Sequence, residues 1–320
     1  MEYCKRCDDL QVGRSPDGKR LYLRRGTRGR CRSYPLAAGN LLLSLNGRNQ
    51  PRAPGMTRRQ LWQWLCRFER DGFLQAPDPL LLEWGSVILC FPCRKLRSRP
   101  IGPLCWLYNR LIALGWLPLL GLLFWRMSSP DGLTLPHSTL TFRQSLLWGL
   151  ACNLPLLVLH ELAHAAAARY RGMPVSGFGV GLCTLMPCAA VLLQTMEYAP
   201  ARVRREVLAA GPQCNLALGA ALLLVCGRAP AWMGEYLYLA GVISLVLGLV
   251  NLLPVASGLD GAQILRTFPA LARIQAGDWQ DEQEFICWGS YRLATAAGLA
   301  ALLVYQAVSL LVTVEGVIGG

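Results

Sequence analysis

The sequence predicts a mainly α-helical membrane protein, with about five transmembrane helices behind a small α+β domain. The 320 residues are 53% apolar and only 16% charged, and their mean hydropathy is +0.32. A soluble domain averages about 25% charged residues. Five apolar runs follow residue 103, each of about the twenty residues needed to cross a hydrocarbon core. These features argue against a soluble enzyme and against a disordered chain.

The net charge of +13 is concentrated at the N-terminal end. Residues 1–103 hold 20 of the 32 Lys and Arg but 8 of the 19 Asp and Glu, so the rest of the chain is nearly neutral. We therefore expect a basic domain in residues 1–100 and a transmembrane domain in residues 104–316. Residues 1–9 are polar, so no cleavable signal peptide is expected.

The basic domain carries the signals of a small winged-helix-like fold. Residues 14–32 alternate weakly and favour a hairpin, and an apolar run follows at 36–45. Thr57 and Gln60 form a capping box in front of a helix that ends at Gly72. Its apolar face is expected to consist of Leu61, Trp64, Leu65 and Phe68.

The apolar runs are expected to span the membrane at 104–125, 146–168, 207–226, 236–254 and 293–313. Residues 175–196, between the second and third, are apolar but rich in Gly, Val and Cys and broken by Pro187, which favours β structure. Lipid does not tolerate exposed strands. This segment must therefore be a re-entrant hairpin covered by protein, or lie at the interface.

Basic residues predict the orientation of the spans. Four of them crowd the entrance to the first span, which is expected to keep the N-terminal domain in the cytosol. They are Arg94, Lys95, Arg97 and Arg99. The segment after the second span then lies in the cytosol too, in agreement with its five arginines: Arg169, Arg171, Arg202, Arg204 and Arg205.

Two of the three histidines belong to the run His160-Glu161-Leu162-Ala163-His164. Residues i and i+4 share one face of a helix, so both imidazoles can hold one Zn²⁺ while Glu161 activates its water. A buried polar cluster that only stabilises a helix bundle is the alternative. Ionisable groups inside a span are costly and mark functional sites, so we favour one catalytic zinc.

Zinc needs a third protein ligand and an open fourth position. The remaining histidine, His137, lies in a loop on the predicted outer side. Asp260 follows the fourth span at the cytosolic side, at a depth similar to that of the two histidines. Asp260 is therefore the expected third ligand, and a structural role in an Asp-Gly turn is the alternative.

Three motifs lie on consecutive membrane segments: residues 160–164, the run Ala-Gly-Pro-Gln-Cys-Asn at 210–215, and Asn251-Leu252-Leu253-Pro254 with Leu259-Asp260-Gly261. In this order they resemble the site-2 protease family of intramembrane zinc metalloproteases. Residues 172–175 resemble the start of that family's re-entrant hairpin. The resemblance covers residues 146–266. The spacing from Asn251 to Asp260 is one residue longer than the commonest family spacing, and Val255-Ala256-Ser257-Gly258 replaces the usual second proline.

The resemblance implies a role for each matching residue. His160, His164 and Asp260 would bind zinc, and Glu161 would be the general base. Asn215 and Asn251 would line the active site and hold the substrate or the zinc ligands. The implied reaction is metal-assisted hydrolysis of a peptide bond, in a substrate that unwinds and pairs with the hairpin as an added strand.

Residues 41–47, together with the capped helix and residues 72–74, resemble a PqqD-like peptide-recognition domain. Such domains bind the leader peptides of ribosomally made natural products, which implies a leader peptide as a partner. A basic domain that rests on anionic membrane lipid is the alternative. Binding of nucleic acid is the least favoured interpretation.

Two Cys-x-x-Cys pairs, Cys4 with Cys7 and Cys90 with Cys93, have the ligand types of a structural zinc site. The pairs are more than eighty residues apart, unlike compact zinc sites. Scattered reduced thiols are the alternative.

The sequence thus predicts a zinc endopeptidase in the bacterial inner membrane, with its N-terminus and active-site face in the cytosol. Its substrate would be a membrane-associated peptide, a transmembrane segment or a leader peptide. Cleavage would either mature a ribosomally made peptide or release a membrane-anchored transcriptional regulator. A non-proteolytic membrane adaptor or peptide-export component is the alternative from another class.

Overall fold

The computed structural model describes residues 4–27, 29–75, 80–83, 86–92, 103–129, 141–183, 186–253 and 259–268. The chain divides into two compact units. The first comprises Met1–Cys105 with Ala168–Arg204, and the second comprises Trp106–Ala167 with Arg205–Gly320.

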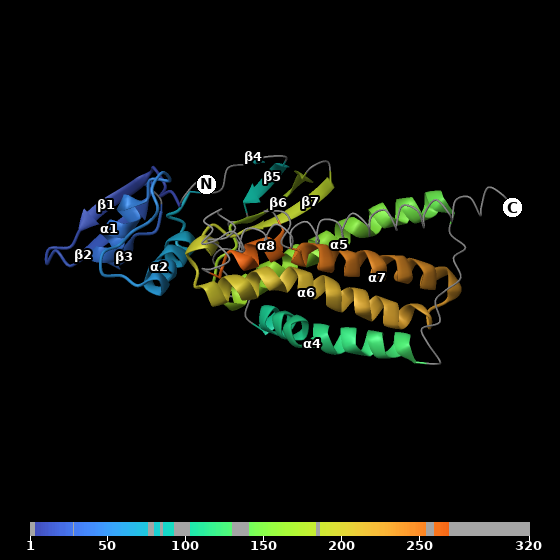
Figure 1. Cartoon of the computed structure of the whole chain (residues 1–320). Coiled ribbons are helices and arrows are strands. Elements are labelled where there is room, and N and C mark those ends of the chain that lie inside the picture. Colours follow the sequence, from blue (N-terminus) through green and yellow to red (C-terminus); the bar gives the residue numbers. More distant parts are fainter. Residues whose placement is uncertain are drawn as a thin grey trace, which may run out of the picture. The chain divides into compact units, whose positions relative to one another are not determined.

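The first unit begins with a three-stranded antiparallel sheet, drawn in blue in Figure 1. Its strands are β1 (Leu10–Arg14), β2 (Arg20–Arg25) and β3 (Arg32–Pro35), in this order. Leu21 and Leu23 alternate with exposed residues and are buried, as period-2 patterning requires. A hairpin is predicted for residues 14–32, whereas β1 and β2 form it over residues 10–25 and β3 adds a third strand.

Two helices cover the buried face of this sheet. They are α1 (Leu36–Ser44) and α2 (Arg58–Arg70). The predicted capping box is confirmed, because Thr57 and Gln60 each bond the other's backbone N–H. Of the predicted apolar face, Leu65 and Phe68 are buried, whereas Leu61 and Trp64 are half-buried. Trp62, Cys66 and Glu69 are buried as well, so α2 is covered on a second side.

A second, four-stranded antiparallel sheet has the order β4-β5-β6-β7. It consists of β4 (Leu80–Glu83), β5 (Ser86–Pro92), β6 (Gly177–Cys183) and β7 (Met186–Leu192). A short 3₁₀ helix, η1 (Met196–Tyr198), follows. The β structure predicted for 175–196 is confirmed. The structure groups this segment with the N-terminal part of the chain, whereas the sequence placed it in the transmembrane domain, because β5 pairs with β6 across 84 intervening residues.

The helices of the second part are α4 (Pro103–Ser128), α5 (Phe142–Tyr170), α6 (Ala201–Cys226), α7 (Ala231–Leu252) and α8 (Asp260–Leu265). The first four contain segments long and apolar enough to cross a membrane. They correspond to the first four predicted spans. The fifth predicted span, 293–313, lies outside the described residues.

Helix α6 packs against both α4 and α7 (Figure 1). Leu123 of α4 and Leu223 of α6 form a buried cluster with Ala220, and Val242 of α7 packs against it. The backbones of α6 and α7 approach closely at Gly219, where an added Cβ would lie 2.8 Å from the carbonyl oxygen of Gly241. Small residues at such crossings are how helices associate in lipid.

This close approach predicts the effect of one added methyl group. Gly219→Ala should destabilise the helix bundle by about 1–3 kcal/mol, the usual cost of overpacking. Gly121→Ala is the matched control, because no atom of the described residues lies within 4 Å of a Cβ added at that position of α4. Thermal unfolding in detergent should show a melting temperature lowered by about 2 °C or more for Gly219→Ala and not lowered for Gly121→Ala. Equal melting temperatures would contradict the packing of α6 on α7.

Candidate metal centre

Helix α5 presents His160 and His164 on one face, as their spacing predicts. Their Nε2 atoms are 3.1 Å apart, and the rings meet edge to face. Both side chains are buried. Glu161 is half-buried, and one of its carboxylate oxygens lies within 4.8 Å of a ring nitrogen of each histidine. The ligand atoms of these three residues are thus close enough together to hold a metal ion.

Asp260, the first residue of α8, joins the two histidines from a distant point in the sequence. Its Oδ2 lies 3.1 Å from Nε2 of His160 and 3.3 Å from Nε2 of His164. The side chain is 8% exposed. These two nitrogens and the carboxylate oxygen therefore form a nearly equilateral triangle of potential metal ligands on buried side chains.

The size of this triangle fits a zinc ion. Zinc bonds of about 2.0–2.1 Å to nitrogen and oxygen, in tetrahedral geometry, place the ligand atoms about 3.3–3.4 Å apart. Two ring nitrogens and a carboxylate oxygen this close would repel one another through their lone pairs unless a cation or proton lay between them. The residues present therefore fit zinc, as predicted for His160, His164 and Asp260.

Hydrogen bonds from α6 set the tautomer of His164. Its Nδ1 lies 2.7 Å from the carbonyl oxygen of Val207, which can only accept. Nδ1 therefore carries the proton, and in the neutral ring Nε2 keeps its lone pair toward His160 and Asp260. Such a partner behind a histidine is typical of metal ligands.

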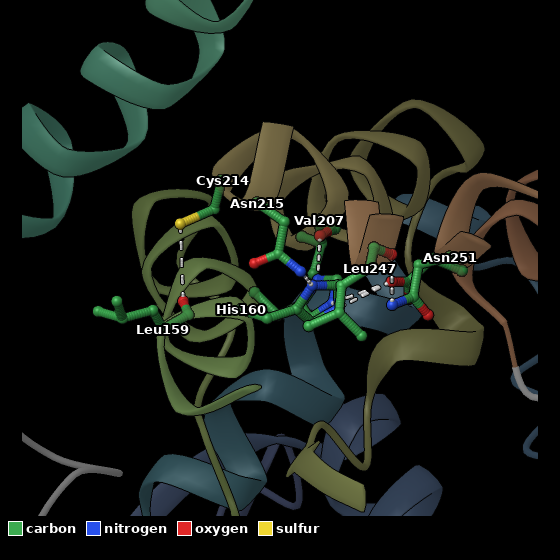
Figure 2. A network of polar contacts seen from close by, with 9 residues as sticks. Leu159, His160, Val207, Cys214, Asn215, Leu247 and Asn251 are labelled. Atoms are coloured by element: carbon green, nitrogen blue, oxygen red, sulfur yellow. Dashed lines mark hydrogen bonds and ion pairs between the residues drawn. The ribbon is translucent and has the colours of Figure 1, made fainter. Parts of the chain in front are cut away.

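Asn215 of α6 stands behind His160 in the same way (Figure 2). The nitrogen of its fully buried side-chain amide lies 3.2 Å from Nδ1 of His160, and the amide oxygen has no hydrogen-bond partner among the described residues. A half-turn of an amide exchanges its nitrogen and oxygen, so either atom can face the ring. With the oxygen facing Nδ1–H, Nε2 of His160 is free to bind a metal. The hydroxyl of Ser244 on α7 donates to the backbone carbonyl oxygen of Asn215 at 2.8 Å and so holds this part of α6 in place.

The other predicted site residues lie elsewhere. Asn251 donates to the Leu247 carbonyl oxygen of its own helix at 3.1 Å (Figure 2), so no described hydrogen bond joins it to the histidines. Cys4 and Cys7 donate to backbone carbonyls, and with Cys90 they do not form a group close enough to hold an ion. Burial raises the pKa of the Cys4 thiol to about 12. Cys93 lies outside the described residues.

Three contributors were missed by sequence reasoning. Val207 acts through its carbonyl, so its side chain carries no signal. Tyr108 of α4 donates to the Leu159 carbonyl at 3.3 Å and lies 3.2 Å from the Cys214 sulfur, which ties α4 to the residues before His160 and Asn215. Gly211 stood in the 210–215 motif but received no role.

Comparison with known proteins agrees with this geometry. Residues 149–231, which include the two histidines and Asn215, match the model of peptidase family M50. This part of the chain is similar to that family. The predicted resemblance to site-2 proteases is confirmed for these residues, whereas the PqqD-like resemblance of the N-terminal domain stays a prediction.

Two Mycobacterium tuberculosis proteins, from strains Erdman and H37Rv, are 34% identical to this chain over 125 residues. Both bear the name zinc metalloprotease Rip3. The match covers 38% of this chain and 30% of each relative. No solved structure matches the chain. The segment that carries His160 and His164 is thus similar to zinc metalloproteases of the M50 type.

Gly211 offers a sharp test of the metal centre. An added Cβ would lie 2.4 Å from Nε2 of His164 and 2.5 Å from Nε2 of His160, so the metal-binding edge of both rings needs a glycine there. Gly211→Ala should therefore lose the zinc. The matched control is Gly149→Ala on α5, where a Cβ would meet only Ile243 at an ordinary 3.7 Å.

Elemental analysis of both variants in detergent measures the zinc. About one zinc per chain is expected for the wild type and Gly149→Ala, and almost none for Gly211→Ala. Full zinc in a folded Gly211→Ala variant would place the metal away from these rings.

Proposed function

We propose that this chain is an intramembrane zinc endopeptidase. In this proposal His160, His164 and Asp260 hold the metal, and Glu161 is the general base. The observation that carries it is the buried triangle of three donor atoms, with edges of 3.1–3.3 Å, beside the carboxylate of Glu161. Because the match covers less than a third of its relatives, whole-chain activity is inferred from this site rather than from their names.

The protein's own residues would supply proton transfer and orientation. A bound zinc would contribute a Lewis acid that polarises the scissile carbonyl and makes water more acidic. Glu161 accepts the proton of the attacking water and passes it to the leaving amine nitrogen. Val207 and Asn215 keep the two imidazoles oriented while the charges change.

The substrate is proposed to be a membrane-associated peptide or a transmembrane segment. The catalytic residues lie on a helix apolar enough to span the membrane. A helical substrate would hide its peptide bonds in its own hydrogen bonds, so it must be extended before cleavage. An extended segment could add to β7, the last strand of the described sheet, in the manner of β-augmentation.

We further propose that the protein lies in a bacterial inner membrane with its N-terminus and active-site face in the cytosol. The arginines that precede α4 and those that follow α5 support this orientation. A cytosolic N-terminal domain is well placed to select a peptide, such as the leader of a ribosomally made precursor.

Glu161→Gln separates catalysis from metal binding. The amide cannot accept a proton but preserves the shape of the side chain, so zinc should remain at about one per chain while cleavage falls about 10²–10⁴-fold. His160→Ala should lose both. The assay uses single-span reporter proteins reconstituted with the full chain and follows product by mass spectrometry.

Two results would contradict the proposal. One is cleavage by Glu161→Gln at the wild-type rate. The other is a folded, zinc-loaded wild type that cleaves no reporter, which would favour a membrane adaptor that keeps the fold without turnover.

A further inference from the structure

Residues of the N-terminal part of the chain form hydrogen bonds with both ends of the hairpin made by β6 and β7. We call this set of contacts the grip. Ser176 immediately precedes β6, and Gln194 and Thr195 follow β7. Ser176 and Thr195 are fully buried. Each of the three residues contacts a residue from the first 75, so the grip belongs wholly to the first unit.

A buried carboxylate holds the first end of the hairpin. Glu69 of α2 is fully buried, and its Oε1 accepts the hydroxyl proton of Ser176. The backbone N–H of Ser176 donates to Leu192 at 2.8 Å, and its Oγ accepts the N–H of Gln194 at 3.4 Å. Ser176 therefore ties the two ends of the hairpin to each other and to α2. Burying a carboxylate is costly unless it is hydrogen-bonded, so this position is unlike an ordinary helix surface.

Three further contacts hold the second end. The Gln194 side-chain amide donates to the Gln75 carbonyl oxygen at 3.0 Å, and Cys4 donates to the Gln194 carbonyl oxygen at 3.5 Å. The sulfur of Cys66 lies 3.5 Å from the Thr195 hydroxyl. Burial raises the pKa of the Cys66 thiol to about 12, so it stays a neutral hydrogen-bonding group at neutral pH.

The same N-terminal part closes one edge of the hairpin. Strand β5 pairs with every residue of β6, from Gly177 to Cys183 (Figure 1). In the described sheet the hairpin's remaining edge is β7. The polar grip on α2 and the pairing by β5 thus fix the hairpin from two directions.

In the sequence, the hairpin comes between the two helices that carry the proposed metal centre. Helix α5, with His160 and His164, ends at Tyr170, and α6, with Asn215, begins at Ala201. The gripped residues, Ser176 to Thr195, are therefore the segment through which the chain passes from one of these helices to the other.

We infer that Glu69 is a positioning residue, which through Ser176 fixes the hairpin so that β7 can receive the substrate strand. In this inference the N-terminal domain contributes to substrate binding and is not merely linked to the protease domain. A ligand that displaces α2 would also displace the hairpin. This inference rests on the proposed function for the role of β7, while the grip itself can be measured without proteolysis.

Hydrogen exchange on the full chain in detergent measures the grip. Glu69→Ala and Ser176→Ala should each speed exchange of the β6 and β7 amides by about tenfold or more, the factor expected from one lost buried hydrogen bond. Glu69→Gln keeps an acceptor for Ser176 and should stay close to the wild type. Gln63→Ala, on the exposed side of α2, is the matched control. The double variant Glu69→Ala/Ser176→Ala should exchange about as fast as Ser176→Ala alone, because that single variant already removes the contact with Glu69.

Cleavage of the single-span reporter adds a readout that a merely structural role would not change. Glu69→Ala should raise KM several-fold with kcat and zinc content unchanged, and Glu69→Gln should restore KM. Unchanged hairpin exchange in Glu69→Ala overturns the grip, and faster exchange with an unchanged KM overturns the positioning role. If neither the wild type nor any of these variants contains zinc, the proposed function fails, whatever the exchange of the hairpin shows.

Discussion

Two imidazoles can share one metal ion only when each ring turns a lone pair toward it. In this protein two residues of α6 contact the Nδ1 atoms of the rings and so orient the opposite nitrogens, Nε2, toward the proposed metal. The Val207 carbonyl holds Nδ1–H of His164, and the Asn215 amide lies against Nδ1 of His160. Both bonds are buried, where a hydrogen bond is stronger and a missing one costs more than in water. The geometry of the proposed metal centre therefore depends on how α6 lies beside α5.

Close helix packing maintains that relation. Gly211 lets the α6 backbone pass directly over the two Nε2 atoms, and Gly219 lets the same helix approach α7. Asp260 follows the C-terminal end of α7 and is the first residue of α8. Just after α8, the guanidinium of Arg205 lies over the ring of Phe268, 4.5 Å from its centroid. In lipid, where apolar contact between helices gains little, such close packing and a few polar bonds hold the site together.

The sequence predicts the centre well because its chemistry resides in side chains at fixed spacings. The i, i+4 histidines, Glu161 and Asp260 come together as expected. Val207 could not be found in this way, since any residue offers a carbonyl. The roles of Glu69 and β5 could not be predicted either. Glu69 contacts Ser176, and β5 pairs with β6, and in both cases the partner lies more than eighty residues further along the chain. Those contacts also explain why α2 is buried on a side that its apolar pattern did not predict.

X-ray absorption at the zinc edge identifies the atoms that bind the metal. We expect two imidazole nitrogens and a carboxylate oxygen at about 2.0–2.2 Å, with the outer-shell scattering of histidine rings. Asp260→Asn should alter the oxygen shell without adding sulfur. A spectrum dominated by sulfur at about 2.3 Å, or one without imidazole scattering, would exclude His160, His164 and Asp260 as the ligands and favour the cysteines.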